Sequence, residues 1–499
     1  MTPRTHPPQP SDRTHGSALP AFAAALLCLG CAPSEPEVPE AEPPNLLLVS
    51  LDTLRADRVG AYGYDRETTP FLDSLAEEGI VLEHVTAPSS RTASSHMSMF
   101  SGLRPGSHGV INYVNEEGVA AAKNLPLLGE LLEDAGFTNA GFTGGGMMRG
   151  ELGFSRGFEI YDHAGGGAQP VFERAETWLR NRNANDLPFF LFVHTYEIHD
   201  PYTPPLKWQD RFAPNYKGKM NRGGKIAIPG DQKSAAEHRD LFADERKRFW
   251  NGFDASRPSD LQHVSNLYDA GVAYTDDLLG QFYGVVEELG LEENLLTAVI
   301  SDHGEAFMDH GYISHRTIHQ EILEVPFLFR LPGAEHAGRR VERHVEGIDL
   351  FPSLLELLGV PVPEHVQGRS FVPDLSGTGL EPSEPWAELA SPGSDMAALR
   401  RDDWKLIAFP SRDESGALFD LASDPREKRN RIQEEPELAE GLREDMKRIA
   451  EENLALLNRF TPRAIRLDEQ GLLELQLLGY AEEIPEPTPE GSSEAKAQD

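Results

Sequence analysis

The chain has 499 residues, of which 39% are hydrophobic, and its 46 basic and 81 acidic residues give a formal net charge of −35. This composition is that of a globular chain, with enough length for two domains, and it excludes a largely disordered protein. The excess of acidic groups repels a phosphate backbone, so nucleic acid is not an expected partner, and an anionic substrate must be captured by a local cation.

Residues 1–31 have the features of a lipoprotein signal peptide. Arg4 and Arg13 precede the apolar run ALPAFAAALLCLG, which is too short to span a membrane as a permanent helix. The following LCLGC resembles the lipobox of bacterial lipoproteins, which implies acylation of Cys31 and a membrane lipid anchor. A cleaved signal without lipid is the alternative. We therefore expect a cell envelope lipoprotein, periplasmic or attached to the outer membrane, with the Pro/Glu-rich residues 32–44 as a linker.

The only two cysteines, Cys28 and Cys31, lie in this leader. Disulfides, zinc–thiolate sites and cysteine nucleophiles are therefore excluded from the folded part. The chemistry of the protein must come from oxygen and imidazole groups.

Short apolar runs alternate with segments of helical periodicity along the chain. The apolar runs are bounded by turn residues and predict buried strands, whereas the periodic segments end at glycine and predict helices. This alternation predicts an α/β fold with a mostly parallel central sheet flanked by helices. The predicted strands are 45–51, 188–194, 295–301 and 325–331, and the predicted helices are 69–79, 125–136 and 272–290.

Polar residues follow three of these strands. In parallel sheets, ligand-binding and catalytic residues gather at the carboxyl ends of the strands. Asp52 follows the first strand. His194 is the last residue of the second strand, and His199 lies shortly after it. The adjacent Asp302 and His303 follow the third strand. Buried charges are costly unless they are paired or bound to metal, so this grouping predicts a divalent cation. Ca²⁺ or Mg²⁺ suits a site dominated by oxygen, and Mn²⁺ or Zn²⁺ suits one in which imidazole binds.

These residues lie in motifs that resemble the sulfatase family of the alkaline phosphatase superfamily, nearly from end to end. The resemblance implies an alkaline-phosphatase-like catalytic domain over 45–380, a smaller antiparallel α+β subdomain over 381–460, one divalent metal ion, most often Ca²⁺, and hydrolysis of sulfate esters. The matching stretches are NLLLVSLDTLRAD, GLRPGSHGV, PFFLFVHTYEIHDPYTPP, SDHGE, HQEILEVPFLFRLPG, GIDLFPSLLELLGV and ALRRDDWKLIAFPSRDESGALFDLASDPREKRN.

The family signature places a glycine ten residues after a cysteine or serine nucleophile. Counting back from Gly102 gives Thr92, and His96 then stands where the family has arginine. The rival TAPSS at 86–90 puts that glycine six residues too far away. Threonine carries a methyl group on Cβ and cannot be oxidised to the aldehyde, so formylglycine is not expected and the oxygen of Thr92 itself must attack.

The resemblance assigns the remaining roles by position. The metal ligands would be Asp52, Thr92, Asp302 and His303. His199 would be the general acid, for which its ordinary pKa near 6.5 is suitable. Two histidines fall where the family binds the anionic group of the substrate, and of these we favour His315 over His310.

The family's GKWHLG motif, whose lysine and histidine bind the sulfate group, is absent near residue 140. Arg149 is the nearest cation that could replace them. Gly144 to Gly146 could offer backbone N–H groups to an anion, although a turn is the commoner role of such a run. The insertion 206–262 is either a solvated loop or a rim that steers an anionic ester, and 461–499 is expected to be partly disordered.

Three functions stay open. The first is a metal-dependent hydrolase of sulfate esters, on an anionic small-molecule or glycan substrate. The second is a phosphatase, phosphodiesterase or phosphonate-ester hydrolase that forms a phospho-Thr92 intermediate. The third is a binding protein descended from an enzyme, against which the joint presence of the metal and acid residues argues.

Overall fold

A computed structural model describes residues 43–110, 117–183, 188–220, 246, 248–377, 379, 383–389, 396–409 and 416–466. The expected signal peptide, nearly all of the linker and residues 467–499 lie outside the described residues. The account below concerns the described residues from 43 onward, which cluster in one unit.

The central sheet has eight strands among the described residues, in the order β12-β2-β11-β8-β1-β7-β5-β6. Only β11 runs antiparallel to its two neighbours, so the predicted mostly parallel sheet is confirmed. The strands are β1 (Asn45–Leu51), β2 (Ile80–Leu82), β5 (Thr138–Phe142), β6 (Ile160–Asp162), β7 (Phe189–Thr195), β8 (Leu295–Ile300), β11 (Phe327–Arg330) and β12 (Arg339–Val341).

The middle strand β1 is buried on both faces because alternate side chains enter two different cores. Leu46 and Leu48 belong to one core, whereas Leu47 and Val49 belong to the other. In register, Val49 pairs with Val193 of β7 and Val299 of β8. The carboxyl ends of these three parallel strands therefore lie at the same edge of the sheet.

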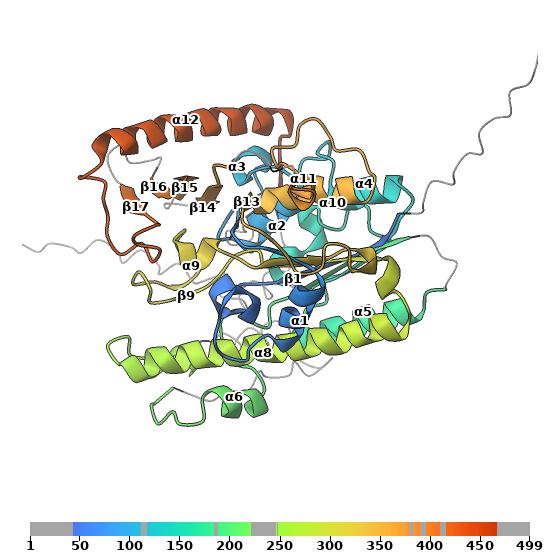
Figure 1. Cartoon of the computed structure of the whole chain (residues 1–499), viewed down its shortest axis with the longest axis horizontal. Helices are drawn as coiled ribbons and strands as arrows, with labels where there is room; N and C mark the ends of the chain where they lie inside the picture. The colour runs from blue at the N-terminus through green and yellow to red at the C-terminus, as the bar shows by residue number, and fades with distance from the viewer. Residues whose placement is uncertain are drawn as a thin grey trace, which may run out of the picture. The chain divides into compact units, whose positions relative to one another are not determined.

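Helices cover both faces of this sheet (Figure 1). One core receives side chains from α2 (Thr92–Ser101), α4 (Leu128–Asp134) and α10 (Leu350–Leu357). The other receives side chains from α1 (Pro70–Glu78), α5 (Ala168–Arg180) and α8 (Pro258–Glu288). The predicted helices correspond to α1, α4 and the second half of α8, which begins earlier than expected.

Short elements complete this part of the chain. They are the strands β3 (Val85–Thr86), β4 (Glu117–Ala120), β9 (Ala306–Phe307), β10 (Ile313–Ser314), β13 (Val345–Glu346) and β18 (Arg463–Arg466), and the helices α3 (Pro105–His108), α6 (Leu206–Phe212), α9 (Gln320–Leu323) and α11 (Val372–Leu375). The expected insertion starts with α6 and ends inside α8, and its residues 221–245 lie outside the described part of the chain. Among the described helices, none is both long and apolar enough to cross a bilayer.

The C-terminal subdomain is an antiparallel sheet covered by one long helix. Its strands follow one another as β14 (Trp386–Leu389), β15 (Met396–Arg401), β16 (Trp404–Ala408) and β17 (Gly416–Asp420). Leu399, Leu406 and Leu418 pack with Leu442 and Ile449 of α12 (Pro436–Arg459) into a separate core. The expected antiparallel α+β subdomain is confirmed, and Figure 1 shows α12 lying across these strands.

Candidate active site

Asp52, Asp302 and His303 meet where β1 and β8 end, and each offers a ligand atom within 4.8 Å of the others. The meeting follows from the pairing of the two strands, in which Ser50 lies opposite Ile300. Thr92 begins α2 and joins the group, with its Oγ1 3.2 Å from Oδ2 of Asp52 and 3.4 Å from Nε2 of His303. All four side chains are fully buried. The structure therefore brings together the complete set expected to bind metal.

The donor atoms of this group suit a cation. Oδ1 of Asp52 and Oδ2 of Asp302 have no hydrogen-bond partner among the described residues. Nδ1 of His303 lies 3.0 Å from the Gly304 carbonyl, which only accepts, so Nδ1 carries the proton and the lone pair is on Nε2. Burial also lowers the pKa of His303, which keeps its ring neutral. Carboxylate oxygens, a hydroxyl and one neutral imidazole match a divalent metal ion.

The two carboxylates of the group respond differently to burial. Burial raises the pKa of Asp52 well above its ordinary value, and the neighbouring Asp302 adds to this effect. Burial opposes ionisation of Asp302 as well, but the nearby His303, His96 and His194 hold its pKa below the ordinary value. A bound cation would favour the ionised form of both.

His96 braces Thr92 rather than reaching into the candidate metal site formed by Asp52, Thr92, Asp302 and His303, which is called the metal group below. Its Nδ1 lies 2.8 Å from the backbone carbonyl of Thr92, one helical turn earlier, so Nδ1 donates there. Its Nε2 lies 2.8 Å from the Ser50 hydroxyl on β1, from which it accepts a hydrogen bond. Nδ1 is also 3.6 Å from Oδ2 of Asp302. The ring thus ties the start of α2 to β1 and to the strand that bears Asp302.

His194 joins the group without having received a role from the sequence. Its Nε2 lies 3.3 Å from Oδ2 of Asp52, and its ring stacks edge-on against His96 at 5.0 Å. The strand register explains the contact, because His194 pairs with Ser50, two residues before Asp52. Burial lowers the pKa of His194 well below 6.5, so it faces the carboxylate as a neutral donor. Its position at the end of a strand beside β1 was the signal by which the sequence grouped it with Asp52, Asp302 and His303.

The turn after β1 is held in place by α8. Thr53 has a left-handed backbone with φ 61°, and its N–H donates to Oδ1 of Asp302 at 3.2 Å. The Tyr268 hydroxyl donates to the Thr53 carbonyl at 2.7 Å and accepts from the N–H of Arg55 at 2.9 Å. Left-handed backbone is uncommon for threonine and persists where neighbours fix it. Tyr268 therefore fixes the turn that presents Asp52.

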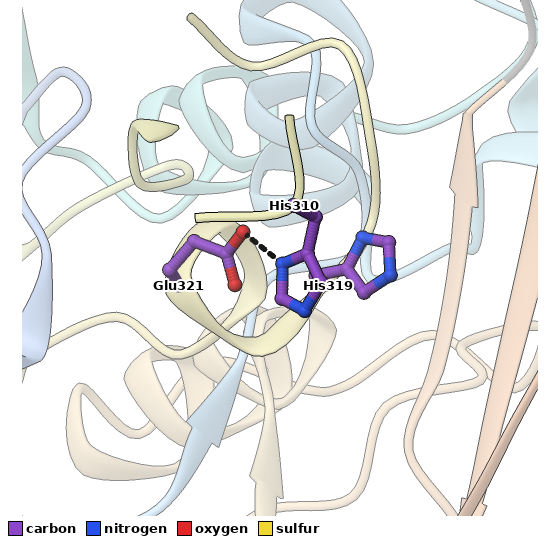
Figure 2. A group of neighbouring side chains, drawn as sticks. All are labelled: His310, His319 and Glu321. Carbon is purple, nitrogen blue, oxygen red and sulfur yellow. Dashed lines mark hydrogen bonds and ion pairs between the residues drawn. The ribbon is translucent and has the colours of Figure 1, made fainter. Parts of the chain in front are cut away.

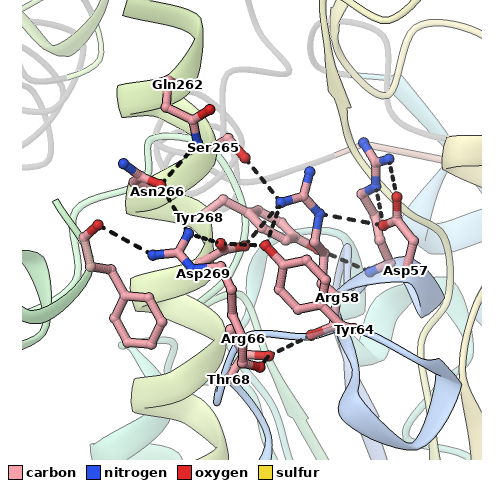
Figure 3. A network of polar contacts seen from close by, with 12 residues as sticks. Asp57, Arg58, Tyr64, Arg66, Thr68, Gln262, Ser265, Asn266, Tyr268 and Asp269 are labelled. Atoms are coloured by element: carbon pink, nitrogen blue, oxygen red, sulfur yellow. Dashed lines mark hydrogen bonds and ion pairs between the residues drawn. The ribbon is translucent and has the colours of Figure 1, made fainter. Parts of the chain in front are cut away.

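Asp269, next to Tyr268, anchors a later part of the loop after β1, between Arg58 and Arg66 (Figure 3). Its buried carboxylate accepts from Arg58 at 3.1 Å, from the Tyr64 hydroxyl at 2.7 Å and from Arg66. The loop after β1 is thus attached to α8 at two successive residues.

His199 and His315 lie beside the metal group. Nδ1 of His199 donates to the Asp200 carbonyl at 2.7 Å, and its ring lies 5.1 Å from that of His315. The His315 ring in turn lies 4.5 Å from that of His303. Burial lowers the pKa of His199 to about 4, in contrast to the value near 6.5 expected from the sequence. Its ring is therefore neutral at pH 7 until an anion approaches.

Glu305 is a second buried group that the sequence did not single out. Its Oε1 lies 3.2 Å from Nδ1 of His315, and both side chains are buried. Burial raises the pKa of Glu305 well above its ordinary value, with Asp200 as a further cause. Its place two residues after His303, directly after the third strand, was the available signal. Glu305 orients the ring of His315.

Gly144 to Gly146 and Arg149 belong to one loop, which packs against Tyr196. The N–H of Met147 donates to the Tyr196 hydroxyl at 3.1 Å, and a Cβ on Gly144 would lie 2.7 Å from the Tyr196 ring. Gly144 therefore serves close packing. Arg149 follows the short 3₁₀ turn Gly146–Met148, is buried, and contacts Glu151 at 3.2 Å. Its loop packs against Tyr196, whose ring lies 5.7 Å from that of His199.

The structure does not bring His310 into this group. It lies at the turn between β9 and β10, with its ring 2.8 Å from Glu321 and stacked 3.7 Å from His319 (Figure 2). The hairpin is the physical reason, because it separates His310 at the turn from His315 after its second strand. Of the two histidines, only His315 lies beside the metal group.

Comparison with protein families identifies the chain. The sequence profile described as Sulfatase matches residues 44–360, more than half of the chain. The chain belongs to the sulfatase family. A second profile, N-sulphoglucosamine sulphohydrolase C-terminal, matches residues 308–453, which include the strands of the C-terminal subdomain. The first match includes every residue placed in the site above.

Two relatives show the extent of the likeness. Arylsulfatase K of Bos taurus is 27% identical over 300 residues, which are 56% of this chain and 54% of that protein. This chain thus spans about half the length of that relative. The N-acetylglucosamine-6-O-sulfatase of Bacteroides thetaiotaomicron is 22% identical over 506 residues, covering 84% of this chain and 87% of the relative.

Solved structures share the fold. The phosphonate monoester hydrolase of Agrobacterium radiobacter matches with a TM-score of 0.64 and 20% identity, over 85% of this chain and all of that chain (100%). A protein solved in complex with its substrate D-glucosamine-2-N,6-O-disulfate matches with a TM-score of 0.65 and 19% identity, over 84% and 99%. At this identity the likeness establishes the alkaline-phosphatase-like fold, and with it the predicted fold class.

Proposed function

We propose that this chain is a metal-dependent hydrolase of sulfate esters in which the hydroxyl of Thr92 is the nucleophile. One observation carries the proposal: a buried hydroxyl at the first residue of α2 contacts both Asp52 and His303. Membership of the sulfatase family supports the ester class. The names of the sulfatase relatives support an anionic sugar ester as substrate.

Asp52, Thr92, Asp302 and His303 would hold one divalent cation. The family favours Ca²⁺, and the imidazole of His303 also admits Mn²⁺ or Zn²⁺. When bound, such an ion lowers the pKa of a coordinated hydroxyl and neutralises the charge of an anionic ester. The identity of the ion is part of the proposal.

The residues around Thr92 prepare its oxygen for attack. Asp52 accepts the hydroxyl proton in a hydrogen bond of 3.2 Å, and His96 holds the Thr92 carbonyl, so the side chain has a fixed direction. The N-terminus of α2 carries a partial positive charge that favours a developing alkoxide and an approaching anion. In the first step, the proton of Oγ1 passes to Asp52, Oγ1 bonds to sulfur, and the bond from sulfur to the leaving oxygen breaks.

His199 and His315 act on different parts of the ester, the leaving oxygen and the anionic group. His199 donates a proton to the leaving oxygen, and His315 contacts an oxygen of the anionic group. Both rings are neutral in the free protein because burial lowers their pKa values. An anionic substrate raises the pKa of His199 and so supplies the protonated form where it is needed. Water then attacks sulfur and gives a proton to His199, the bond from sulfur to Oγ1 breaks, and Thr92 regains its proton from Asp52.

Hydrolysis of phosphate or phosphonate esters is the second candidate, and the identity of residue 92 favours it. Threonine has no route to the aldehyde hydrate that expels sulfate by breaking a carbon–oxygen bond. A covalent sulfo-threonine must be cleared by attack at sulfur, whereas a phospho-threonine can be hydrolysed in line. The fold is compatible with both, since a phosphonate monoester hydrolase shares it.

Matched substrates separate the candidates. The protein is assayed with an aryl sulfate, the corresponding aryl phosphate and a phosphodiester, each with Ca²⁺, Mg²⁺, Mn²⁺ or Zn²⁺, beside Thr92→Ala. A preference of several orders of magnitude for the sulfate, lost in Thr92→Ala, supports the first candidate. The same preference for a phosphorus ester establishes the second. Equal rates for wild type and Thr92→Ala leave a binding protein.

We also propose the lipid anchor that the LCLGC stretch suggests. Cys31 lies outside the described residues, so the proposal is supported by the sequence alone. The mass of the mature N-terminal peptide tests it: an acylated Cys31 supports an envelope lipoprotein, and an unmodified N-terminus at another residue contradicts it.

A further inference from the structure

His315 belongs to a β-hairpin whose two ends have different surroundings. Its strands pair antiparallel, Ile313 with Phe307 and Ser314 with Ala306. The base of the hairpin carries Glu305 and His315, which contact each other at 3.2 Å beside the metal group. We call residues 305–315 the active-site hairpin.

The tip of the active-site hairpin contacts the C-terminal subdomain. Nε2 of His310 lies 3.1 Å from each of the backbone carbonyls of Arg426 and Glu427, in the loop after β17. The ammonium group of Lys428 in the same loop donates to the carbonyl of Asp309. One loop of the subdomain thus contacts two successive residues at the tip.

The partners of His310 determine its charge. Carbonyl oxygens only accept, so Nε2 must carry a proton. Nδ1 lies 2.8 Å from Oε1 of Glu321, and the largely buried pair is an imidazolium–carboxylate contact. With acceptors on both sides, His310 donates through both nitrogens. These are charge-assisted hydrogen bonds, the stronger kind.

The same geometry argues against a metal ion held by His310, His319 and Glu321, although their ligand atoms lie close together. The two imidazole rings stack at 3.7 Å with only 10° between their planes. Parallel stacked rings direct their nitrogen lone pairs side by side, so the pair cannot point at one ion. Both nitrogens of His310 are also engaged in donating protons.

The subdomain loop is itself rigidly held. Glu427 has a left-handed backbone with φ 54°, and its buried carboxylate pairs with Lys405 of β16 at 2.8 Å. The other carboxylate oxygen accepts from the N–H of Gln320 at 2.7 Å, at the start of α9. A strained backbone persists where its surroundings fix it. Here they fix the carbonyl of Glu427 opposite His310.

We propose that His310 joins the active-site hairpin to the C-terminal subdomain and thereby positions His315 for substrate binding. We call the hydrogen bonds of His310 to Glu321 and to the carbonyls of Arg426 and Glu427 the clasp. His310 is then a positioning residue, and the subdomain contributes to turnover without touching the substrate. The effect of the clasp on turnover rests on the proposed function. The mechanical part of the proposal, that the clasp holds the hairpin against the subdomain, does not.

The clasp depends on pH because a neutral His310 cannot donate through both nitrogens. The charged groups that face it are Glu321, Lys428, Arg426 and the nearby Asp309, and His319 stacks on its ring. Although burial opposes the charge, the contact with Glu321 raises the pKa of His310 above 6.5. The stabilisation is therefore complete below pH 6.5 and is lost as the pH rises through the higher value in the folded protein.

Hydrogen exchange of peptides from residues 306–314 tests the mechanical part between pH 6 and 9, with rates corrected for the intrinsic effect of pH. We expect protection in the wild type to fall as the pH rises. In His310→Ala the protection of these peptides against exchange should be about tenfold lower than in the wild type at pH 6, and it should not change with pH. Lys428→Ala, an exposed change that leaves the fold intact, should lower it less. His336→Asn, at an exposed histidine, is the control and should match the wild type.

Equal protection in His310→Ala and wild type would overturn the clasp, whatever the activity of the protein. The second readout is turnover of the ester that the wild type hydrolyses. We expect His310→Ala to raise KM about tenfold, with a smaller loss of kcat, and to remove the alkaline decline of kcat/KM. A loosened hairpin with unchanged KM and kcat would overturn the positioning of His315. Absence of wild-type hydrolysis with a loosened hairpin would contradict the proposed function and leave the clasp supported.

Discussion

The hydroxyl of Thr92 donates to Oδ2 of Asp52 at 3.2 Å, so the first residue of α2 and the first residue after β1 share one buried site. In the proposed function, the oxygen of Thr92 is the atom that attacks. Thr92→Ser keeps the hydroxyl and should retain activity within about tenfold, whereas Thr92→Ala should lower kcat at least about 10³-fold. Steady-state rates with the preferred ester check both. An active Thr92→Ala would exclude a covalent route through this residue.

Metal binding should stabilise the protein through the two carboxylates that lie at the ends of β1 and β8. A ligand at 100 times its Kd adds about 2.7 kcal/mol to the free energy of unfolding. Thermal unfolding with increasing concentrations of each divalent ion should show a rise in Tm for the wild type and for Asp65→Asn, an exposed control. Asp302→Asn should show none. A rise of the same size in Asp302→Asn would place the ion elsewhere.

His199 should matter most when the leaving group is poor. Substituting His199 by Asn removes the proton donor and should lower kcat about 10² to 10⁴-fold for an alkyl ester. The loss should be much smaller for a 4-nitrophenyl ester, because nitrophenolate leaves without a proton. The ratio of the two losses is the measurement. Equal losses for both esters would give His199 a role in binding instead.

Tyr268 should act on the site without touching it. Tyr268→Phe removes the hydrogen bonds to Thr53 and Arg55 and should lower the free energy of unfolding by about 1 to 3 kcal/mol. Because Thr53 follows Asp52, metal affinity should fall as well. Urea unfolding and metal titration measure the two effects, and Tyr312→Phe, at a largely exposed tyrosine, is the matched control. Unchanged metal affinity would show that the turn does not depend on α8.

His108, which contacts Ser98 of α2, should make the stability of the protein sensitive to acid. Burial lowers its pKa to about 3, and its Nδ1 accepts from the N–H of Val110 at 3.0 Å. The unfolded chain binds a proton near pH 6.5 and the folded chain does not, so stability falls as the pH drops below 6.5.

Between pH 6.5 and 5 this histidine should cost about 2 kcal/mol of stability. His108→Gln removes that term, so the stability advantage of the wild type over the variant at pH 7 should shrink by this amount at pH 5. Urea unfolding at both pH values measures the difference. A constant difference would show that His108 titrates normally in the folded protein.

The sequence predicted the elements of the site for a physical reason. The strands 45–51 and 295–301 are continuous apolar runs, and parallel strands place their carboxyl ends at one edge, so Asp52, Asp302 and His303 were expected together. The spacing to Gly102 selected Thr92 among the many hydroxyls of its stretch. Both inferences depend on local pattern and family register, which the chain carries in its residues.

Other features depend on contacts between distant segments. His194 became part of the site through its register with Ser50, and Glu305 through its contact with His315. The pKa of His199 depends on burial by other elements, which its neighbours in sequence do not reveal. The left-handed turn at Thr53 is fixed by Tyr268, 215 residues away.

The sequence alone predicted the four strand runs 45–51, 188–194, 295–301 and 325–331, the register that selects Thr92 and the absence of cysteine after residue 31, because these follow from residue type and short-range spacing. The family register favoured His315 over His310, and only the tertiary structure shows why these two residues, five apart in the chain, have different surroundings. A hairpin places one against the C-terminal subdomain and the other beside the metal group, and the partners that hold each end come from remote parts of the chain.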